Sequence, residues 1–245
     1  MKNILLLLTI SISCLSAGTI NVALAANVSY AIDDLKKEFN KKHPNTKVRV
    51  TLGSSGKLTA QIKHGAPYEL FMSADMKYPQ ALYKEKIALS EPKVYALGSL
   101  AMLSNKKRDF SKGIYVLKDK DIQKIAIANP KIAPYGIAAM QALTNAKINN
   151  DVKSKFIYGE SISQTVSYAV TAADIGIIAK SSLYSKNMSK YKENINWVAV
   201  DSSLYTPIKQ GVVILKEDAE VKAFYEFILS QDAKKIFKNY GYLLP

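Results

Sequence analysis

Residues 53–75 read GSSGKLTAQIKHGAPYELFMSAD and place a Gly/Ser loop at the start of a predicted helix, which leads back to a short strand. The first N–H groups of a helix have no intrahelical partner and carry the positive end of its dipole. A loop that ends in Ser54, Ser55 and Gly56 therefore offers donors to a small oxyanion, although either serine also suits simple capping of the helix. The spacing excludes a nucleotide-binding P-loop, because two residues rather than four separate its first glycine from the Gly-Lys pair.

The start of the chain has the pattern of a secretory signal peptide. A lysine precedes an apolar run over residues 4–12, which is too short to span a bilayer. Small residues suit cleavage near 16–18 or after Ala25, but the later cut would remove TINVALA (19–25), which has the composition of a core strand. We therefore predict a signal peptide over residues 1–18 and a periplasmic protein.

The single cysteine of the chain, Cys14, lies in this leader. The mature protein would then contain no thiol and no disulfide, so its stability must come from a packed core. Lipid modification of Cys14 and a membrane anchor remain the less favoured alternative, because residues 10–13 read ISIS rather than a leucine-led signal.

The chain is strongly basic, with a formal net charge of +14, which falls to +13 when residues 1–17 and their one lysine are removed. Its lysines are spread along helices such as 33–42, and no basic patch interleaved with aromatic residues is present. The charge pattern argues against nucleic acid as a partner. It predicts a diffuse field that attracts an anionic ligand or an acidic partner.

Strand-like and helix-like segments alternate along the chain, which predicts an α/β fold with parallel β-α-β units. Apolar residues at Ile32, Leu35 and Phe39 have helical spacing, and the stretch 218–240 predicts two consecutive helices packed on a sheet. The predicted strands are Ile20–Ala25, Lys47–Leu52, Glu69–Ser73, Val94–Ser104, Ile125–Ala128, Phe156–Tyr158, Asp174–Ile178, Trp197–Val200 and Ile208–Leu215.

Two further junctions have the same form as the Gly/Ser loop. Residues 129–136, NPKIAPYG, follow a strand and open a helix, and residues 159–164, GESISQ, do the same. Tyr135 in the first of these is either a buried structural residue or a ligand for whatever lies beyond the strand. Because ligands of open α/β sheets bind outside the carboxyl ends of the strands, we expect the three junctions to converge on one crevice.

Six ordered blocks extend these junctions over most of the chain: ANVSY (26–30), GSSGKL (53–58), GAPYELFMSAD (65–75), ANPKIAPYG (128–136), GESISQT (159–165) and AADIGIIA (172–179). Through these blocks the chain resembles the periplasmic molybdate-binding proteins of ABC transporters. It implies a two-lobed periplasmic-binding-protein fold of type II that holds molybdate or tungstate between its lobes through uncharged donors. The implied oxyanion-binding residues are Asn27, Ser55, Tyr135 and the backbone N–H of Ile162.

The same resemblance implies a monomer that delivers its ion to a membrane permease, without a cofactor and without direct protein ligands to the metal atom. Some members of the family have a hydroxyl residue where Asn27 falls and a tyrosine where Ala179 falls, so the set of hydrogen bonds here need not match theirs. The preference between molybdate and tungstate stays open.

A two-lobed fold gives boundaries to the two halves. We expect one lobe over residues 19–97 and 208–245 and the other over 98–207. The chain would cross between them near 97–99 and 205–208, and these crossings would form a hinge.

Molybdate and tungstate present only acceptors near neutral pH, so a site made only of donors suits them better than it suits a partly protonated phosphate. Glu160 is the one carboxylate near these junctions, and we expect it to point outward or to cap a helix. Sulfate, thiosulfate or phosphate on the same scaffold is the nearest alternative, and an exported basic interaction module is a more distant one.

An enzyme is not indicated. His43 and His64 each lie at a predicted helix end, and nothing places His64 within reach of Ser55 to make a hydrolase with Asp75. Two isolated histidines and no mature cysteine supply no metal-ligand cluster.

Overall fold

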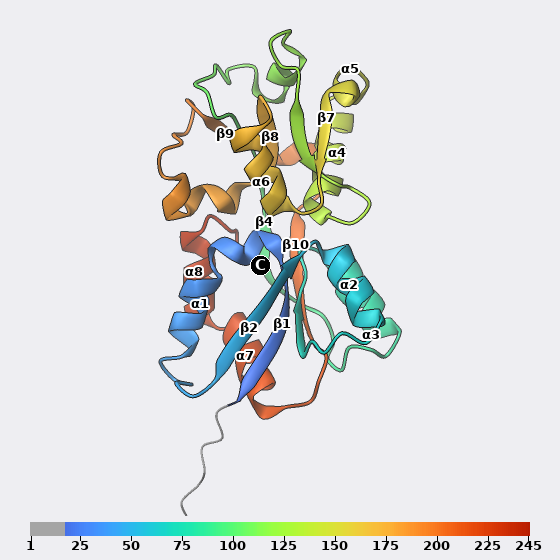
Figure 1. Cartoon of the computed structure of the whole chain (residues 1–245), viewed down its shortest axis with the longest axis vertical. Helices are drawn as coiled ribbons and strands as arrows, with labels where there is room; N and C mark the ends of the chain where they lie inside the picture. The colour runs from blue at the N-terminus through green and yellow to red at the C-terminus, as the bar shows by residue number, and fades with distance from the viewer. Residues whose placement is uncertain (1–17) are drawn as a thin grey trace, which may run out of the picture.

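The computed structural model describes residues 18–245, so the predicted leader, its cleavage near residue 17 and Cys14 lie outside the described part of the chain. Two five-stranded sheets, each with its own helices, form two lobes joined at the middle of the molecule (Figure 1). The predicted two-lobed α/β fold is confirmed. No helix within 18–245 is long and apolar enough to cross a membrane.

The first lobe is built on a mixed sheet with the strand order β2-β1-β3-β10-β4. Strand β1 runs parallel to β2 and β3, and β10 runs antiparallel to β3 and β4. The strands are β1 (Thr19–Ala25), β2 (Lys47–Gly53), β3 (Leu70–Met72), β4 (Lys93–Gly98) and β10 (Ile208–Ile214). The segment TINVALA is therefore strand β1, which lies between β2 and β3 in this sheet, and a cut after Ala25 would remove it.

Helices cover both faces of this sheet. Successive side chains of β1 point to opposite faces, and buried apolar side chains lie on both, so each face needs a cover. Ile20, Val22 and Leu24 pack into one core with the helices α1 (Ile32–Phe39), α7 (Ala219–Leu229) and α8 (Gln231–Asn239). Ala23 points to the opposite face, which α2 (Ser55–Lys63) and α3 (Lys77–Lys84) cover. The predicted helix over 32–39 and the two C-terminal helices are confirmed.

The second lobe is built on the sheet β7-β6-β8-β5-β9. Its strands are β5 (Leu100–Leu103), β6 (Ile125–Ala128), β7 (Phe156–Gly159), β8 (Ile175–Ala179) and β9 (Trp197–Ala199), and its helices are α4 (Pro134–Asn145), α5 (Asn149–Val152) and α6 (Ile162–Thr171).

Short 3-10 helices occur in both lobes. They are η1 (Ala26–Tyr30), η2 (Gly113–Lys118), η3 (Lys153–Lys155), η4 (Lys180–Tyr184), η5 (Lys186–Met188) and η6 (Ser202–Leu204).

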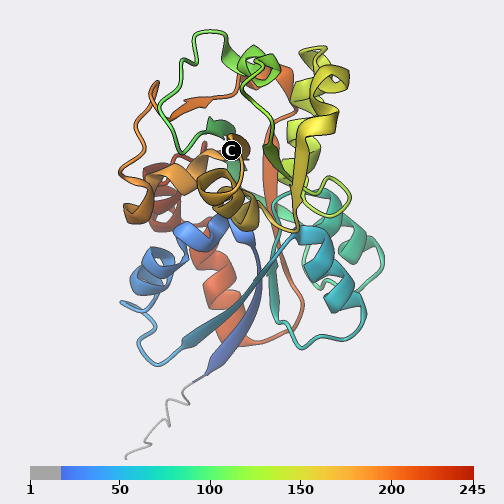
Figure 2. The ribbon, with the colours of Figure 1, turned by 45° about the horizontal axis from the view of Figure 1, so that its top comes forward.

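The chain passes between the sheets twice, and the prediction of one strand over 94–104 is wrong. Strand β4 belongs to the first sheet and β5 to the second, with Ser99 between them. The chain returns between β9 and β10, and β10 runs from the junction of the lobes into the first sheet, where it lies between β3 and β4 (Figure 2). The C-terminal segment closes the junction, because Leu243 pairs with Leu97 at the end of β4.

Candidate functional site

The residues that the sequence singles out come together around one small cavity between the lobes. Asn27 and Ser55 reach it from the first lobe, and Tyr135 and Ile162 reach it from the second. Its volume is about 10 Å³, which is close to the room that one water molecule needs. The remaining lining residues are Ala25, Ala26, Gly53, Ser54, Ala74, Ala133 and Pro134, so no charged side chain lines it.

The cavity lies at the carboxyl ends of strands from both sheets, as the topology of an open α/β sheet predicts. Residues directly after β1, β2 and β3 contribute its first-lobe wall, and the helix starts that follow β6 and β7 contribute the second. Because α2, α4 and α6 all begin here, three helix N-termini, whose first N–H groups have no acceptor within their own helix, converge on one place.

The two serines of the Gly/Ser loop have different surroundings. The Oγ of Ser55 accepts a hydrogen bond from the backbone N–H of Ala74 at 2.9 Å, which ties the loop to the end of β3. Ser54 is the N-cap residue of α2, but its side chain makes no capping bond, and its buried Oγ has no partner within residues 18–245. Ser54, which the sequence names as part of the donor loop but which the family resemblance does not include among the ligands, is thus a further hydroxyl of the cavity.

Asn27 is fully buried, and its side-chain nitrogen is already used inside the protein. Nδ2 donates to Gln210 Oε1 at 2.8 Å and to the hydroxyl of Tyr242 at 2.9 Å. Its Oδ1 is buried and finds no partner in the described part of the chain. In this arrangement the side chain of Asn27 has an acceptor rather than a donor available, which differs from the role that the family resemblance implies.

Tyr135 lies in the first turn of α4, where Pro134 occupies a helix start that needs no N–H. Its ring is 1% exposed, and its hydroxyl accepts a hydrogen bond from Gln210 Nε2 at 3.2 Å. Burial raises the pKa of Tyr135 well above its ordinary value, so the phenol keeps its proton at neutral pH. This proton is available for donation.

Ile162 is the first residue of α6, so its N–H has no acceptor within the helix. Glu160 does not line the cavity. Its side chain is 74% exposed, and its carboxylate pairs with Lys57 Nζ at 3.6 Å across the two lobes. The expectation that Glu160 points outward is therefore confirmed, and Lys57 meets this carboxylate rather than the cavity.

Direct bonds hold the lobes together beside the cavity. The N–H of Gly56 donates to the carbonyl of Ile132 at 2.9 Å, and Ser163 Oγ donates to the carbonyl of Ala26 at 2.8 Å. Each bond joins an element of the first lobe to an element of the second. The structure is thus a closed arrangement, in which the two lobes are in direct contact beside the cavity.

The histidines lie away from this site. His43 stacks on Phe39 with ring centroids 4.4 Å apart. His64 follows the last residue of α2, and this helix is about 13 Å long, so His64 cannot reach Ser55 at its other end. Within residues 18–245, no group of three His, Cys, Asp or Glu side chains could hold a metal ion.

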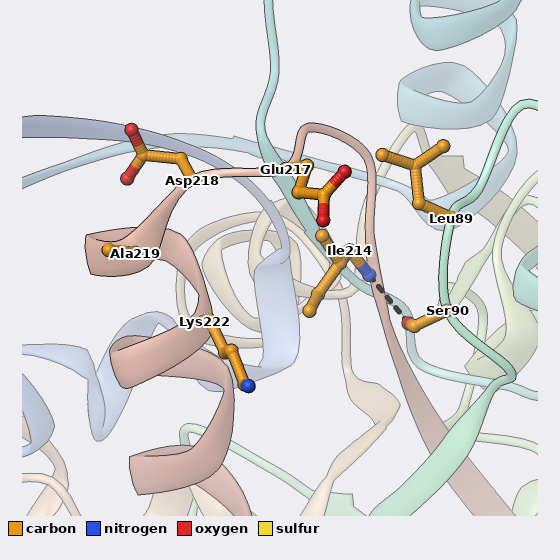
Figure 3. Close-up of a pocket in the computed structure, with 7 residues that line it drawn as sticks. All are labelled: Leu89, Ser90, Ile214, Glu217, Asp218, Ala219 and Lys222. Carbon is orange, nitrogen blue, oxygen red and sulfur yellow. Dashed lines mark hydrogen bonds between the residues drawn. The ribbon is translucent and has the colours of Figure 1, made fainter.

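A wider cavity, of about 640 Å³, is less suited to an anion (Figure 3). It lies near Ile214, which pairs with the opposite end of β3 from the convergent site. Its lining includes two carboxylates, from Glu217 and Asp218, against the single ammonium of Lys222. Its one hydroxyl, from Ser90, already accepts from the N–H of Ile214 at 2.9 Å.

Comparisons with known proteins point in one direction. Residues 20–243 match the family model described as bacterial extracellular solute-binding protein. The molybdate-binding protein ModA of Rhodobacter capsulatus is 36% identical over 93% of this chain and 89% of its own length, and that of Azotobacter vinelandii is 34% identical over 92% and 90%. The solved periplasmic molybdate-binding protein of Azotobacter vinelandii superposes with a TM-score of 0.84 at 32% identity, covering 92% of this chain and 99% of that one.

Proposed function

Since the chain belongs to the bacterial extracellular solute-binding protein family, whose members bind solutes for transport, we propose that its solute is molybdate or tungstate. The observation that carries the proposal is the cavity itself. Both lobes contribute to it, it contains hydroxyl and helix-start N–H donors, and no charged side chain lines it. The names of the relatives support the choice of molybdate.

The proposed ligands are Ser55, Tyr135 and the N–H of Ile162, with Ser54 as an additional donor and Asn27 completing the wall. Hydrogen bonds to charged groups contribute about 1.5–3 kcal/mol each, and micromolar to nanomolar binding needs about 8–12 kcal/mol. Four or five such donors are therefore sufficient without a buried lysine. The cavity is smaller than a tetrahedral oxyanion, so we expect the ion to enter with the lobes apart and to widen the site slightly as they close.

Hydrogen phosphate is the second candidate, and one observation favours it. The unpartnered Oδ1 of Asn27 is an acceptor, which suits an oxyanion that carries a proton. A fully deprotonated dianion requires the amide of Asn27 to rotate, or to take no direct part. Sulfate and thiosulfate are fully deprotonated dianions that offer only hydrogen-bond acceptors, as molybdate does. The size of the ion is what distinguishes them from molybdate.

Delivery and location follow from the same proposal. We expect a periplasmic monomer that closes around its ion by bending at the two crossings near 97–99 and 205–208, and then meets a membrane permease. The basic surface would attract the anion over a distance.

Isothermal titration calorimetry of residues 19–245 against molybdate, tungstate, sulfate and phosphate tests the proposal. We expect one-to-one binding of molybdate or tungstate and no heat from sulfate. Binding of phosphate in place of molybdate at neutral pH would favour the second candidate. No binding of any of the four ions would contradict the proposal and favour an exported interaction module.

A further inference from the structure

Gln210 lies at the centre of a buried hydrogen-bond network that touches two of the proposed ligand residues. Its side chain is fully buried on β10, at the point where the pairing with β4 shifts register between Gln210 and Gly211. Such a bulge re-aims a side chain relative to a regular strand. Gln210 does not line the cavity, so any effect it has on a ligand must act through its neighbours.

The bonds to its oxygen fix which way the amide of Gln210 faces. Oε1 accepts from Asn27 Nδ2 at 2.8 Å and from the hydroxyl of Tyr95 at 2.8 Å. With its oxygen satisfied by these two donors of the first lobe, Nε2 faces the second lobe and donates to Tyr135 at 3.2 Å. The amide of Gln210 therefore bridges the lobes.

This polarity decides where the proton of Tyr135 points. A phenol has one proton, and because the oxygen of Tyr135 accepts from Gln210, its own O–H must turn to another partner. Tyr135 lines the cavity, so the ligand is the partner available to it. If the oxygen of Gln210 faced Tyr135 instead, the phenol would donate to Gln210 and the cavity would lose a donor.

A glycine at the first crossing makes the contact sterically feasible. A Cβ placed on Gly98 would lie within 2.2 Å of the hydroxyl oxygen of Tyr135 and 2.7 Å of Gln210 Nε2. Any side chain at Gly98 would push these two groups from their present positions. The close approach of β4 thus depends on a residue without a side chain.

We propose, on the basis of the proposed function, that Gln210 is a positioning residue which aims the Tyr135 hydroxyl proton at the bound oxyanion and does so only when the lobes are together. It touches no ligand itself. It selects for oxyanions whose oxygen atom next to Tyr135 can accept a hydrogen bond.

A double-mutant cycle with molybdate tests this, by calorimetry on residues 19–245. Tyr135→Phe should weaken binding about 10- to 100-fold, which is the loss of one hydrogen bond to a charged group. Gln210→Met should weaken binding about 10-fold or more in the native background and clearly less when Tyr135 is already Phe. An equal loss in both backgrounds would overturn the proposal.

Gln210→Glu separates hydrogen-bond polarity from shape. An ionised carboxylate of the same size only accepts, so it would accept the hydrogen bond of the Tyr135 hydroxyl and weaken anion binding at any pH where it is ionised. Lowering the pH protonates the buried carboxyl, which can donate to Tyr135 again, so affinity should recover relative to the native protein at the same pH. Native-like affinity of Gln210→Glu at every pH from about 6 to about 9, a range that allows for the raised pKa of a buried carboxyl, would show that only the size of the side chain matters.

Ser90→Ala is the matched control, because it removes a hydrogen bond to the other end of β10 without touching Gln210, and we expect unchanged affinity. If the Gln210 variants do not fold, Gly98→Ala in the same cycle with Tyr135→Phe decides the question. If the native protein binds none of molybdate, tungstate, sulfate and phosphate, the proposed function itself fails. Binding by the native protein with additive losses overturns only the role of Gln210.

Discussion

The ammonium nitrogen of Lys57 lies 3.6 Å from the carboxylate of Glu160, and this ion pair joins α2 of the first lobe to the loop before α6 of the second. Both side chains are more than half exposed, at 57% and 74%. The pair can form only when the lobes are closed. It is therefore a contact at the rim of the site rather than part of the site.

Glu160→Gln should raise the dissociation rate of the bound oxyanion by no more than about fivefold, because exposed pairs contribute up to about 1 kcal/mol. The effect should shrink as salt is added. Stopped-flow displacement at two salt concentrations measures it. Glu85→Gln, which breaks the pair with Lys63 inside the first lobe, is the control and should leave the rate unchanged.

The neighbouring serines should respond differently to alanine. Ser55→Ala should weaken oxyanion binding and also lower the free energy of unfolding by about 1–3 kcal/mol, because the buried N–H of Ala74 loses its acceptor. Ser54→Ala should weaken binding without loss of stability, since its hydroxyl has no partner within 18–245. Calorimetry and thermal unfolding on both variants check this, and equal stability losses would contradict the assignment.

Gly136→Ala should destabilise the protein and displace Tyr135. A Cβ at Gly136 would lie 2.1 Å from the carbonyl oxygen of Ala128, so the start of α4 must move away from β6. We expect a loss of about 1–3 kcal/mol in unfolding free energy, together with weaker anion binding. Thr144→Ala on an exposed part of the same helix should change stability by less than about 0.5 kcal/mol.

The buried tyrosines predict a loss of stability at alkaline pH. Burial raises the pKa of Tyr242 from its ordinary value of 10 to about 12, and raises the pKa values of Tyr95 and Tyr135 well above 10. Between pH 10 and 12 the unfolded chain releases protons that the folded chain keeps, so stability is fully present below pH 10 and falls as the pH rises.

Urea unfolding measures the free energy of unfolding across this pH range. For Tyr135→Phe this free energy should fall less steeply with pH, by the slope that corresponds to about one proton. Tyr158→Phe, at a ring that is 51% exposed, serves as the control and should keep the native decline. An unchanged decline in Tyr135→Phe would mean that the phenol ionises without unfolding the chain.

The sequence predicts those features that local patterns encode. Helical spacing places Ile32, Leu35 and Phe39 in the core, and strand-to-helix junctions identify the segments that meet at the cavity. The apolar run over 94–104 carries no local sign that its halves enter different sheets, apart from Gly98, so its local pattern predicts one strand, and a crossing near 97–99 is expected only from the two-lobed fold.

The network around Gln210 could not be predicted from sequence. Tyr95 is 115 positions away from Gln210, and Asn27 is 215 positions away from Tyr242, so no motif or period links them. Their partnership depends on which strands become neighbours in the sheet. That also explains why the amide of Asn27 was expected to face a ligand, whereas its nitrogen bonds to the protein.

The position of β10 between β3 and β4 has a consequence for the order in which the protein acquires its structure. When residues 19–98 have emerged, β4 has no neighbouring strand, because its partner is more than a hundred positions away. All strands of the second sheet lie between Leu100 and Ala199, so the second lobe can fold as a continuous unit while the first sheet still lacks β10. We therefore expect the second lobe to fold before the first. The first lobe is complete only when the segment from β10 to the C-terminus has added its strand and helices.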